Sequence, residues 1–206
     1  MNHLNSLAQI KNRYFLMRHA LSEANVQKII VSSPHKGVTF YGITAKGKIQ
    51  AQEAAEEALK NGLFDENTLI YSSDFLRCQE TARIVQKVIQ STHLVLTTKL
   101  HERFFGDYDG KGDEHYKIVN EMDVSSLESN DVNVETAASV IKRVTSLIVD
   151  LEEQYENETI LLVSHGFPCA VIDGLFHHLP IRELRANTPL FQNAEIRQIT
   201  FEKPKQ

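Results

Sequence analysis

Residues Arg13–Asn25 read RYFLMRHALSEAN, and this stretch decides the fold that the sequence predicts. Its apolar residues, Tyr14–Met17, stop abruptly at the polar pair Arg18-His19. An unbroken apolar run of this kind indicates a strand that is buried on both faces, as in a parallel sheet. Ligands bind beyond the carboxyl ends of such strands, so we expect Arg18 and His19 at the rim of the sheet.

Two other segments repeat the pattern of an apolar run followed by polar residues. Thr68–Ser73 reads TLIYSS and Thr159–Ser164 reads TILLVS. We expect two further strands at His93–Thr98 (HLVLTT) and Glu195–Phe201 (EIRQITF). The last one is more polar than the others, which is typical of a strand at the edge of a sheet.

Helical patterns fall between these strands. We expect Thr44 to cap a helix that Gly62 closes, and Asp74 and Thr136 to cap two more. A fourth helix is expected to follow Gly166. This alternation predicts an α/β fold, a three-layer α/β/α sandwich whose central sheet is mostly parallel and carries helices on both faces.

The 206 residues suit a single domain, which we expect to span residues 1–206. Two segments, Val26–Gly42 and Lys111–Val134, show little periodicity, and the second is polar and mostly acidic. We expect both to be irregular surface excursions, with a specificity loop or insertion around residues 111–134.

Composition and charge exclude several classes of protein. The formal net charge of −5 argues against a nucleic-acid binder, although a local Arg and His cluster can still attract a small anion. The two cysteines, Cys78 and Cys169, are far apart, which excludes a disulfide framework and a zinc site. No signal-peptide core and no apolar run long enough for a bilayer is present, so we expect a cytoplasmic protein without a membrane partner. A homodimer is left open.

Three further motifs place reactive side chains near the expected strand ends. SSDFLRCQETA (72–82) puts Arg77 in the first turn of a helix, where it strengthens an anion site. HERFFGDYDG (101–110) offers Glu102 as a general acid if its surroundings raise its pKa. VSHG (163–166) sets His165 beside the small Gly166. Taken singly, the Arg77 motif is about equally consistent with an arginine that solvates a helix start, and the Glu102 motif has a surface ion pair as its alternative.

The order of the four motifs resembles the histidine phosphatase superfamily, specifically its phosphoglycerate mutase-like branch. RHALSEAN, SSDFLRCQETA, HERFFGDYDG and VSHG follow one another as the family's signature blocks do, and ITAKGKIQA is similar to a further one. The resemblance implies that His19 is the phosphorylated nucleophile and Glu102 the proton donor. It implies that Arg18, Arg77 and His165 surround the transferred phosphate, and that substrate is bound by Asn25, Ser22, Arg103 and Gly166. It implies no metal ion and no cofactor.

The implied chemistry explains these residue types. A neutral imidazole can attack phosphorus if its other ring nitrogen donates a hydrogen bond that fixes the tautomer. Two guanidiniums match the phosphate oxygens, and a protonated His165 would add a donor. Glu102 would protonate the leaving oxygen and then activate the water that cleaves phospho-His19.

The function implied is a metal-independent phosphatase that hydrolyses a small phosphorylated metabolite, a phosphate monoester, through a phosphohistidine. A phosphoglycerate-type phosphomutase and a non-catalytic phosphate-ligand or protein-binding relative are the alternatives. The chain has no tryptophan and a short segment after the acid loop, and both features favour the phosphatase. It departs from the family at Ala20, where the family has glycine, a change that costs little if the φ angle is negative.

Overall fold

Five strands form one sheet in the computed structural model, which describes residues 2–7, 9–125, 131–179 and 190–201. Their order across the sheet is β3-β2-β4-β1-β5. Neighbouring pairs among the first four strands are parallel, whereas β5 runs antiparallel to β1 at the edge. The mostly parallel sheet and the edge position of EIRQITF are therefore confirmed. The strands are β1 (Arg13–Arg18), β2 (Leu69–Ser73), β3 (Leu94–Thr97), β4 (Thr159–Ser164) and β5 (Ile196–Ile199).

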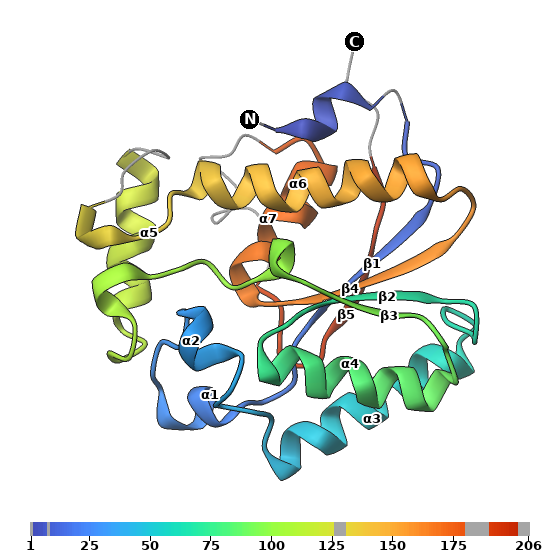
Figure 1. Ribbon diagram of the computed structural model, residues 1–206, viewed down its shortest axis with the longest axis horizontal. Coiled ribbons are helices and arrows are strands. Elements are labelled where there is room, and N and C mark those ends of the chain that lie inside the picture. Colours follow the sequence, from blue (N-terminus) through green and yellow to red (C-terminus); the bar gives the residue numbers. More distant parts are fainter. Residues whose placement is uncertain (1, 8, 126–130, 180–189, 202–206) are drawn as a thin grey trace.

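Helices cover both faces of the sheet, as the three-layer prediction requires (Figure 1). The side chains of β1 alternate between the two layers: Tyr14 and Leu16 pack with α6 and α7, whereas Phe15 and Met17 pack with α3 and α4. No described helix is long and apolar enough to cross a bilayer. The covering helices are α3 (Ala45–Lys60), α4 (Leu76–Ile89), α6 (Ala137–Gln154) and α7 (Gly166–Phe176).

Helix ends follow the sequence signals with one exception. Thr44 accepts a hydrogen bond from the Gly47 amide at 3.0 Å, and Thr136 caps α6 in the same way. The expected cap at Asp74 is wrong, because α4 starts at Leu76 with no side-chain cap at all. The Asp74 carboxylate is instead paired with the ring of His101.

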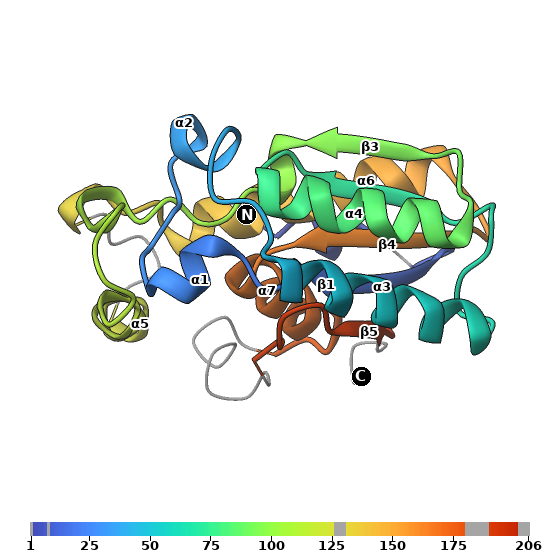
Figure 2. The same ribbon diagram turned by 90° about the horizontal axis from the view of Figure 1, so that it is seen from below.

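A third group of elements lies beyond the carboxyl ends of the strands (Figures 1 and 2). We call it the cap and define it as residues 23–43 and 104–134, of which 126–130 lie outside the described residues. The cap contains α1 (Glu23–Gln27), α2 (Pro34–Gly37) and α5 (His115–Ser125). Short 3-10 turns lie in the cap at Gly106–Tyr108 and Asp131–Asn133, and outside it at His3–Ser6 and Thr98–Leu100.

The prediction of irregular excursions is therefore wrong for residues 115–125, which form α5, and for Pro34–Gly37, which form the one-turn helix α2. Helix α5 buries Val119 in a small cluster with Ile30 and Phe105, against which Tyr116 also packs. Its stability thus depends on packing against segments that are distant in the sequence, and a local pattern cannot show this.

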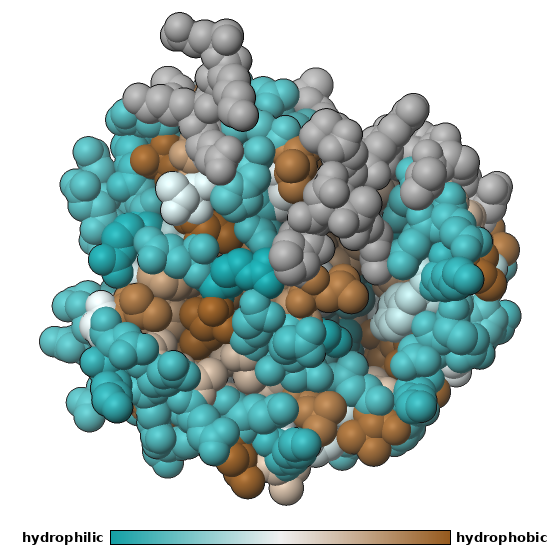
Figure 3. Space-filling view, turned by 180° about the vertical axis from the view of Figure 1, so that it is seen from behind, coloured by the Kyte–Doolittle hydropathy of each residue, from teal (hydrophilic) through white to brown (hydrophobic). Residues whose placement is uncertain are grey.

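The two segments of the cap are joined by their main chains. The Ile30 amide donates to the Lys111 carbonyl at 2.8 Å, and the Gly110 amide donates to the Ile30 carbonyl at 2.7 Å. Asp109 accepts hydrogen bonds from the Ser32 amide and from Lys36 Nζ, at 2.7 and 2.9 Å. In Figure 3 the surface is hollowed where the cap, on the right in that view, meets the rest of the molecule.

Candidate active site

The carboxyl ends of three neighbouring strands carry the predicted reactive groups. Strand β1 leads into Arg18 and His19, β4 leads into His165, and the β2–α4 turn leads into Arg77. The rings of His19 and His165 lie 5.3 Å apart, centre to centre. We call Arg18, His19, Arg77 and His165 the floor of the site.

His19 is held in one tautomer. Its Nδ1 lies 2.8 Å from the carbonyl oxygen of Ala20, which can only accept, so Nδ1 carries the proton. Nε2 has no hydrogen-bond partner within the described part of the chain and keeps its lone pair free. Burial, followed by the charges of Arg77 and Arg18, lowers the pKa of His19 well below its ordinary value. The imidazole is therefore neutral and available as a nucleophile.

Ala20 suits its place beside His19. It is fully buried, its φ angle is not in the positive range, and its amide donates to Thr81 Oγ1 at 3.1 Å. The condition for tolerating alanine in place of glycine is thus met.

The two floor arginines have unused donors. Arg77 is only 4% exposed; it donates to His165 Nδ1 and to the Val31 carbonyl, but its Nη1 has no partner. Arg18 donates from Nη1 to the Phe191 carbonyl at 2.8 Å, while its buried Nε also has none. Neither guanidinium forms an ion pair with a described carboxylate. Buried N–H groups without acceptors cost free energy, so the pair is poised to receive an anion.

In this structure the contacts of His165 are those of a neutral imidazole; the protonated form is expected beside a phosphate dianion. Arg77 donates to its Nδ1 from Nη2 at 2.9 Å, so the proton lies on Nε2, which donates to Ser73 Oγ at 3.0 Å. Burial, then the charges of Arg77 and His19, lowers its pKa well below the ordinary value. His165 therefore orients Arg77 in this structure.

Glu102 lies in surroundings that favour its protonated form. Burial raises the pKa of its carboxyl above the ordinary value, against the lowering influence of Arg77, the Arg103 amide and Arg18. Its one hydrogen bond comes from the Arg103 amide at 2.9 Å. A carboxyl whose pKa is raised keeps its proton to higher pH than an ordinary glutamate and can deliver it to a leaving oxygen.

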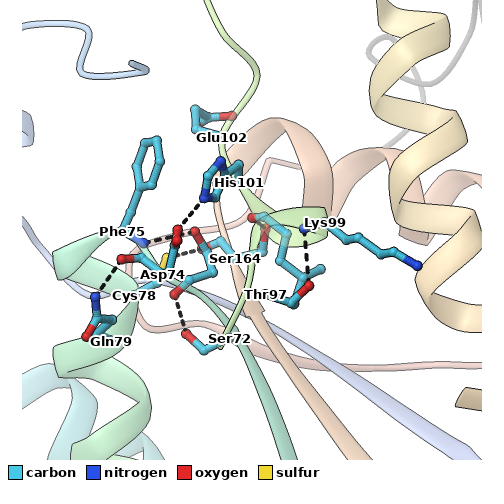
Figure 4. Close-up of polar contacts among 12 residues, drawn as sticks. Ser72, Asp74, Phe75, Cys78, Gln79, Thr97, Lys99, His101, Glu102 and Ser164 are labelled. Carbon is cyan, nitrogen blue, oxygen red and sulfur yellow. Dashed lines mark hydrogen bonds and ion pairs between the residues drawn. The ribbon is translucent and has the colours of Figure 1, made fainter. Parts of the chain in front are cut away.

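Two contacts, at Leu100 and His101, hold the segment that carries Glu102 close to the floor. Just before Glu102, the ring of His101 points at the Asp74 carboxylate in the turn that leads to Arg77 (Figure 4). Ser164 Oγ, at the end of β4, donates to the Leu100 carbonyl at 2.7 Å. These contacts fix the acid relative to the floor.

A cavity of about 360 Å³ has Arg18, Asn25, Glu102 and Gly166 in its walls, whereas His19, Arg77 and His165 are not among its described lining residues. Asn25 Oδ1 accepts from the Ser22 amide and hydroxyl at 3.1 and 2.9 Å, which leaves the amide nitrogen free to donate into the cavity. Ser22 itself is fully buried and is not part of the wall. Four of the residues predicted to bind or react thus meet at this cavity, while Ser22 positions one of them.

Arg103 does not line the cavity. Its Nη1 and Nη2 bind the Asp123 carboxylate at 2.5 and 2.8 Å, and its Nε donates to the Glu135 carbonyl at 2.6 Å. All three nitrogens are thus used inside the protein, and the structure places this side chain beneath the cap.

Sequence reasoning missed several residues around the floor. Asn193 donates to the His19 carbonyl at 3.1 Å and to Asn25 Oδ1 at 3.2 Å, and no motif marks it. Ser73 could have been assigned a role, because it is the last residue of the buried strand β2 and stands in the motif that carries Arg77. On the cap side, Asp113, Tyr116 and Asn120 line the cavity without any sequence signal. No group of three or more potential metal ligands occurs among the described residues.

Comparisons with known proteins identify the family and the fold of this chain. The family model described as "Histidine phosphatase superfamily (branch 1)" matches residues 14–206. A relative from Hydrogenobacter thermophilus, named "Putative phosphoserine phosphatase 2", is 30% identical over 75% of this chain and 73% of its own. An Enterobacter relative named "Probable phosphoglycerate mutase GpmB" is 26% identical over 92% and 85%. A mycobacterial glucosyl-3-phosphoglycerate phosphatase, 21% identical, shares the fold with a TM-score of 0.74 over 90% of this chain and 88% of its own.

Proposed function

The chain belongs to the histidine phosphatase superfamily (branch 1), and from this premise we propose that it is a metal-independent phosphatase acting on a small phosphorylated metabolite. The names of its relatives indicate phosphatase or mutase activity. One observation supports the finer proposal most strongly. Arg77 and Arg18 lie close enough to lower the pKa of His19, and their buried N–H groups at Arg18 Nε and Arg77 Nη1 have no acceptor among the described residues.

The first half of the reaction transfers the phosphoryl group to His19. The unused N–H groups of Arg18 and Arg77 donate to the non-bridging phosphate oxygens and neutralise their charge. Nε2 of His19 attacks phosphorus, and the bond from phosphorus to the ester oxygen breaks. Glu102 gives its proton to that oxygen, so the product leaves as a neutral alcohol. Nδ1 keeps its proton and donates a hydrogen bond to the Ala20 carbonyl, which stabilises the positive charge of the phosphoimidazole.

The second half returns the enzyme to its starting state. Glu102, now a carboxylate, takes a proton from a water molecule that attacks phosphorus on the side the alcohol has left. The bond between phosphorus and Nε2 breaks, inorganic phosphate departs, and both Glu102 and His19 have recovered their original protonation. No metal ion takes part in either step.

The test of this proposal is to trap the intermediate. Enzyme mixed with a ³²P-labelled phosphate ester and quenched in alkali should retain label that is stable to base and released by acid, as phosphohistidine is. His19→Ala should retain none. His177→Ala is the matched control, because this half-exposed histidine lies at the far end of α7 from the site. Full turnover by His19→Ala would overturn the proposal.

The phosphomutase remains the second candidate because one relative carries that name. A mutase must hold a second anionic group of its bisphosphorylated intermediate. Among the described residues that line the cavity, Arg18 is the one basic side chain, and it belongs to the phosphate end. We therefore expect no isomerisation of 3-phosphoglycerate in the presence of 2,3-bisphosphoglycerate; a rate above that of ester hydrolysis would favour the mutase.

A further inference from the structure

The part of the cavity away from the floor has a composition of its own. Its walls are largely apolar, with Ile29, Phe105, Phe167, Ala170 and Phe191. The volume of about 360 Å³ is enough for a single-ring or similarly sized alcohol attached to a phosphate. This apolar space lies where the leaving group must sit, because Glu102 is also part of the wall.

Two hydrogen-bond acceptors interrupt the apolar wall, and both come from the cap. Asn120 Oδ1 is buried and has no hydrogen-bond partner among the residues that the structure describes. The carboxylate of Asp113 forms no ion pair with a described residue and is exposed, so it marks the open end of the cavity.

The register of α5 aims these groups at the cavity. Asp113 lies one turn before Tyr116, whose amide donates to its carbonyl at 3.1 Å, and Asn120 follows one turn later. The ring of Tyr116 packs edge-on against Phe105 at 4.9 Å. This contact holds α5 with Tyr116 and Asn120 on one face, and Asp113 lies in the turn just before the helix.

Building on the proposed phosphatase, we propose that Asn120 and Asp113 select phosphate monoesters whose alcohol part is compact and apolar and carries a hydrogen-bond donor, a hydroxyl or an ammonium group, remote from the phosphate. A buried acceptor without a partner disfavours a purely apolar leaving group, because the amide oxygen would stay unsatisfied. A carboxylate at the open end repels a second anion and attracts a cation. The site thus recognises a donor at one end of the substrate and a phosphate at the other.

The experiment uses four esters of matched leaving-group chemistry: 4-methylphenyl, 4-(hydroxymethyl)phenyl, 4-(aminomethyl)phenyl and 4-(carboxymethyl)phenyl phosphate. The methylene insulates the phenol oxygen from each substituent. We expect kcat/KM for the hydroxymethyl and aminomethyl esters to exceed that of the methyl ester by about 10-fold, and the carboxymethyl ester to fall below it by a similar factor. The advantage of the aminomethyl over the hydroxymethyl ester should shrink at high salt, because Asp113 is exposed.

Variants assign the selectivity to its residues. Asn120→Leu should remove the preference for the hydroxymethyl ester, and Asp113→Asn should remove the discrimination against the carboxymethyl ester. Glu121→Gln is the matched control, because this exposed carboxylate lies on α5 and pairs with Lys117. Equal kcat/KM for all four esters, or selectivity that survives in both variants, would overturn the inference.

A binding measurement separates this inference from the proposed function. Calorimetric titration of His19→Ala with the four esters reports selectivity without turnover. Donor-selective binding with no turnover by the wild type would overturn the phosphatase and keep the cavity assignment. Turnover of all four esters without selectivity in rate or binding would overturn the cavity assignment alone.

Discussion

Two buried arginines, Arg77 in the floor and Arg103 against the cap, are the same side chain in opposite circumstances. Arg77 is 4% exposed, forms no ion pair with a described carboxylate and has an unused Nη1. Arg103 is 1% exposed, and each of its nitrogens is bonded to Asp123 or to the Glu135 carbonyl. A guanidinium that the protein satisfies completely holds the structure together, whereas one left with a free donor is available to an anion. Burial alone does not distinguish them.

Glu102 and Asp109, two carboxylates of the same loop region, differ in the direction in which their pKa values are shifted. Burial raises the pKa of Glu102, and one amide hydrogen bond does not offset it. Burial acts on Asp109 in the same direction, but Lys36 and the Ser32 and Ser33 amides lower its pKa to about 2. Asp109 therefore stays ionised and joins two segments of the cap, so it is unsuited to replace Glu102 as the acid.

The largest effect should follow from Arg77→Met, which breaks the floor. Loss of a guanidinium that stabilises the transferred phosphoryl group is expected to slow phosphorylation of His19 by about 10³–10⁵-fold. The unfolding free energy should change less than in Arg103→Met, because no carboxylate loses its partner. Rapid-quench kinetics and urea denaturation measure the two quantities. Near wild-type phosphorylation would show that Arg77 does not contact the phosphate.

Glu102→Gln should have the next largest effect, and it should depend on the leaving group. For an alkyl ester we expect phosphorylation of His19 to slow by about 10²–10⁴-fold, and for p-nitrophenyl phosphate by much less, because that leaving group needs little protonation. Single-turnover rates are required, since slow water attack would mask the difference at steady state. An equal loss for both esters would show that Glu102 is not the leaving-group acid.

The pH profile of the same step sharpens this assignment. Glu102 must be protonated, and its pKa is raised, so the alkyl-ester rate should persist to higher pH than for an ordinary glutamate and then fall through that pKa. His19 must be neutral, and its lowered pKa puts the acid limb below the range of an ordinary histidine. The Gln variant should lose the alkaline limb and keep the acid limb.

Arg103→Met should act on stability and leave the chemistry in place. Removing one partner of a buried pair typically costs about 3–5 kcal/mol, because Asp123 is left without its counter-ion. We expect the unfolding free energy to fall by about this amount, while folded enzyme phosphorylates His19 from a small aryl ester at close to the wild-type rate. A large drop in that rate in folded protein would show that Arg103 takes part in substrate binding.

Removal of metal ions is expected to have no effect on the hydrolysis rate. Each protein, whether altered in the floor or in the cap, should hydrolyse its ester at the same rate with and without EDTA. Vanadate and phosphate should inhibit by occupying the floor. A rate that vanishes with EDTA and returns with Mg²⁺ would contradict the proposed mechanism.

The floor could be predicted from the sequence because its parts are local. Arg18-His19 and His165 each follow a buried strand, and Arg77 sits one residue into a helix, so short segments determine where they lie. The cap could not, because α5 is stabilised by Phe105 and Ile30 from other segments. The predicted helix N-cap at Asp74 is wrong for the same reason. Its carboxylate pairs with His101, 27 residues away, and a local signal cannot register that competitor.

The hydrogen bonds that close the floor span almost the whole chain. Arg18 reaches the Phe191 carbonyl across 173 residues, and β1 completes its pairing only with β4 and β5. Contacts of such sequence separation form slowly, because a long loop must be closed before they contribute. After dilution from denaturant, the ellipticity of the locally capped helices α3 and α6 should therefore return before phosphatase activity does. During that interval the protein has most of its secondary structure and no means of binding its substrate.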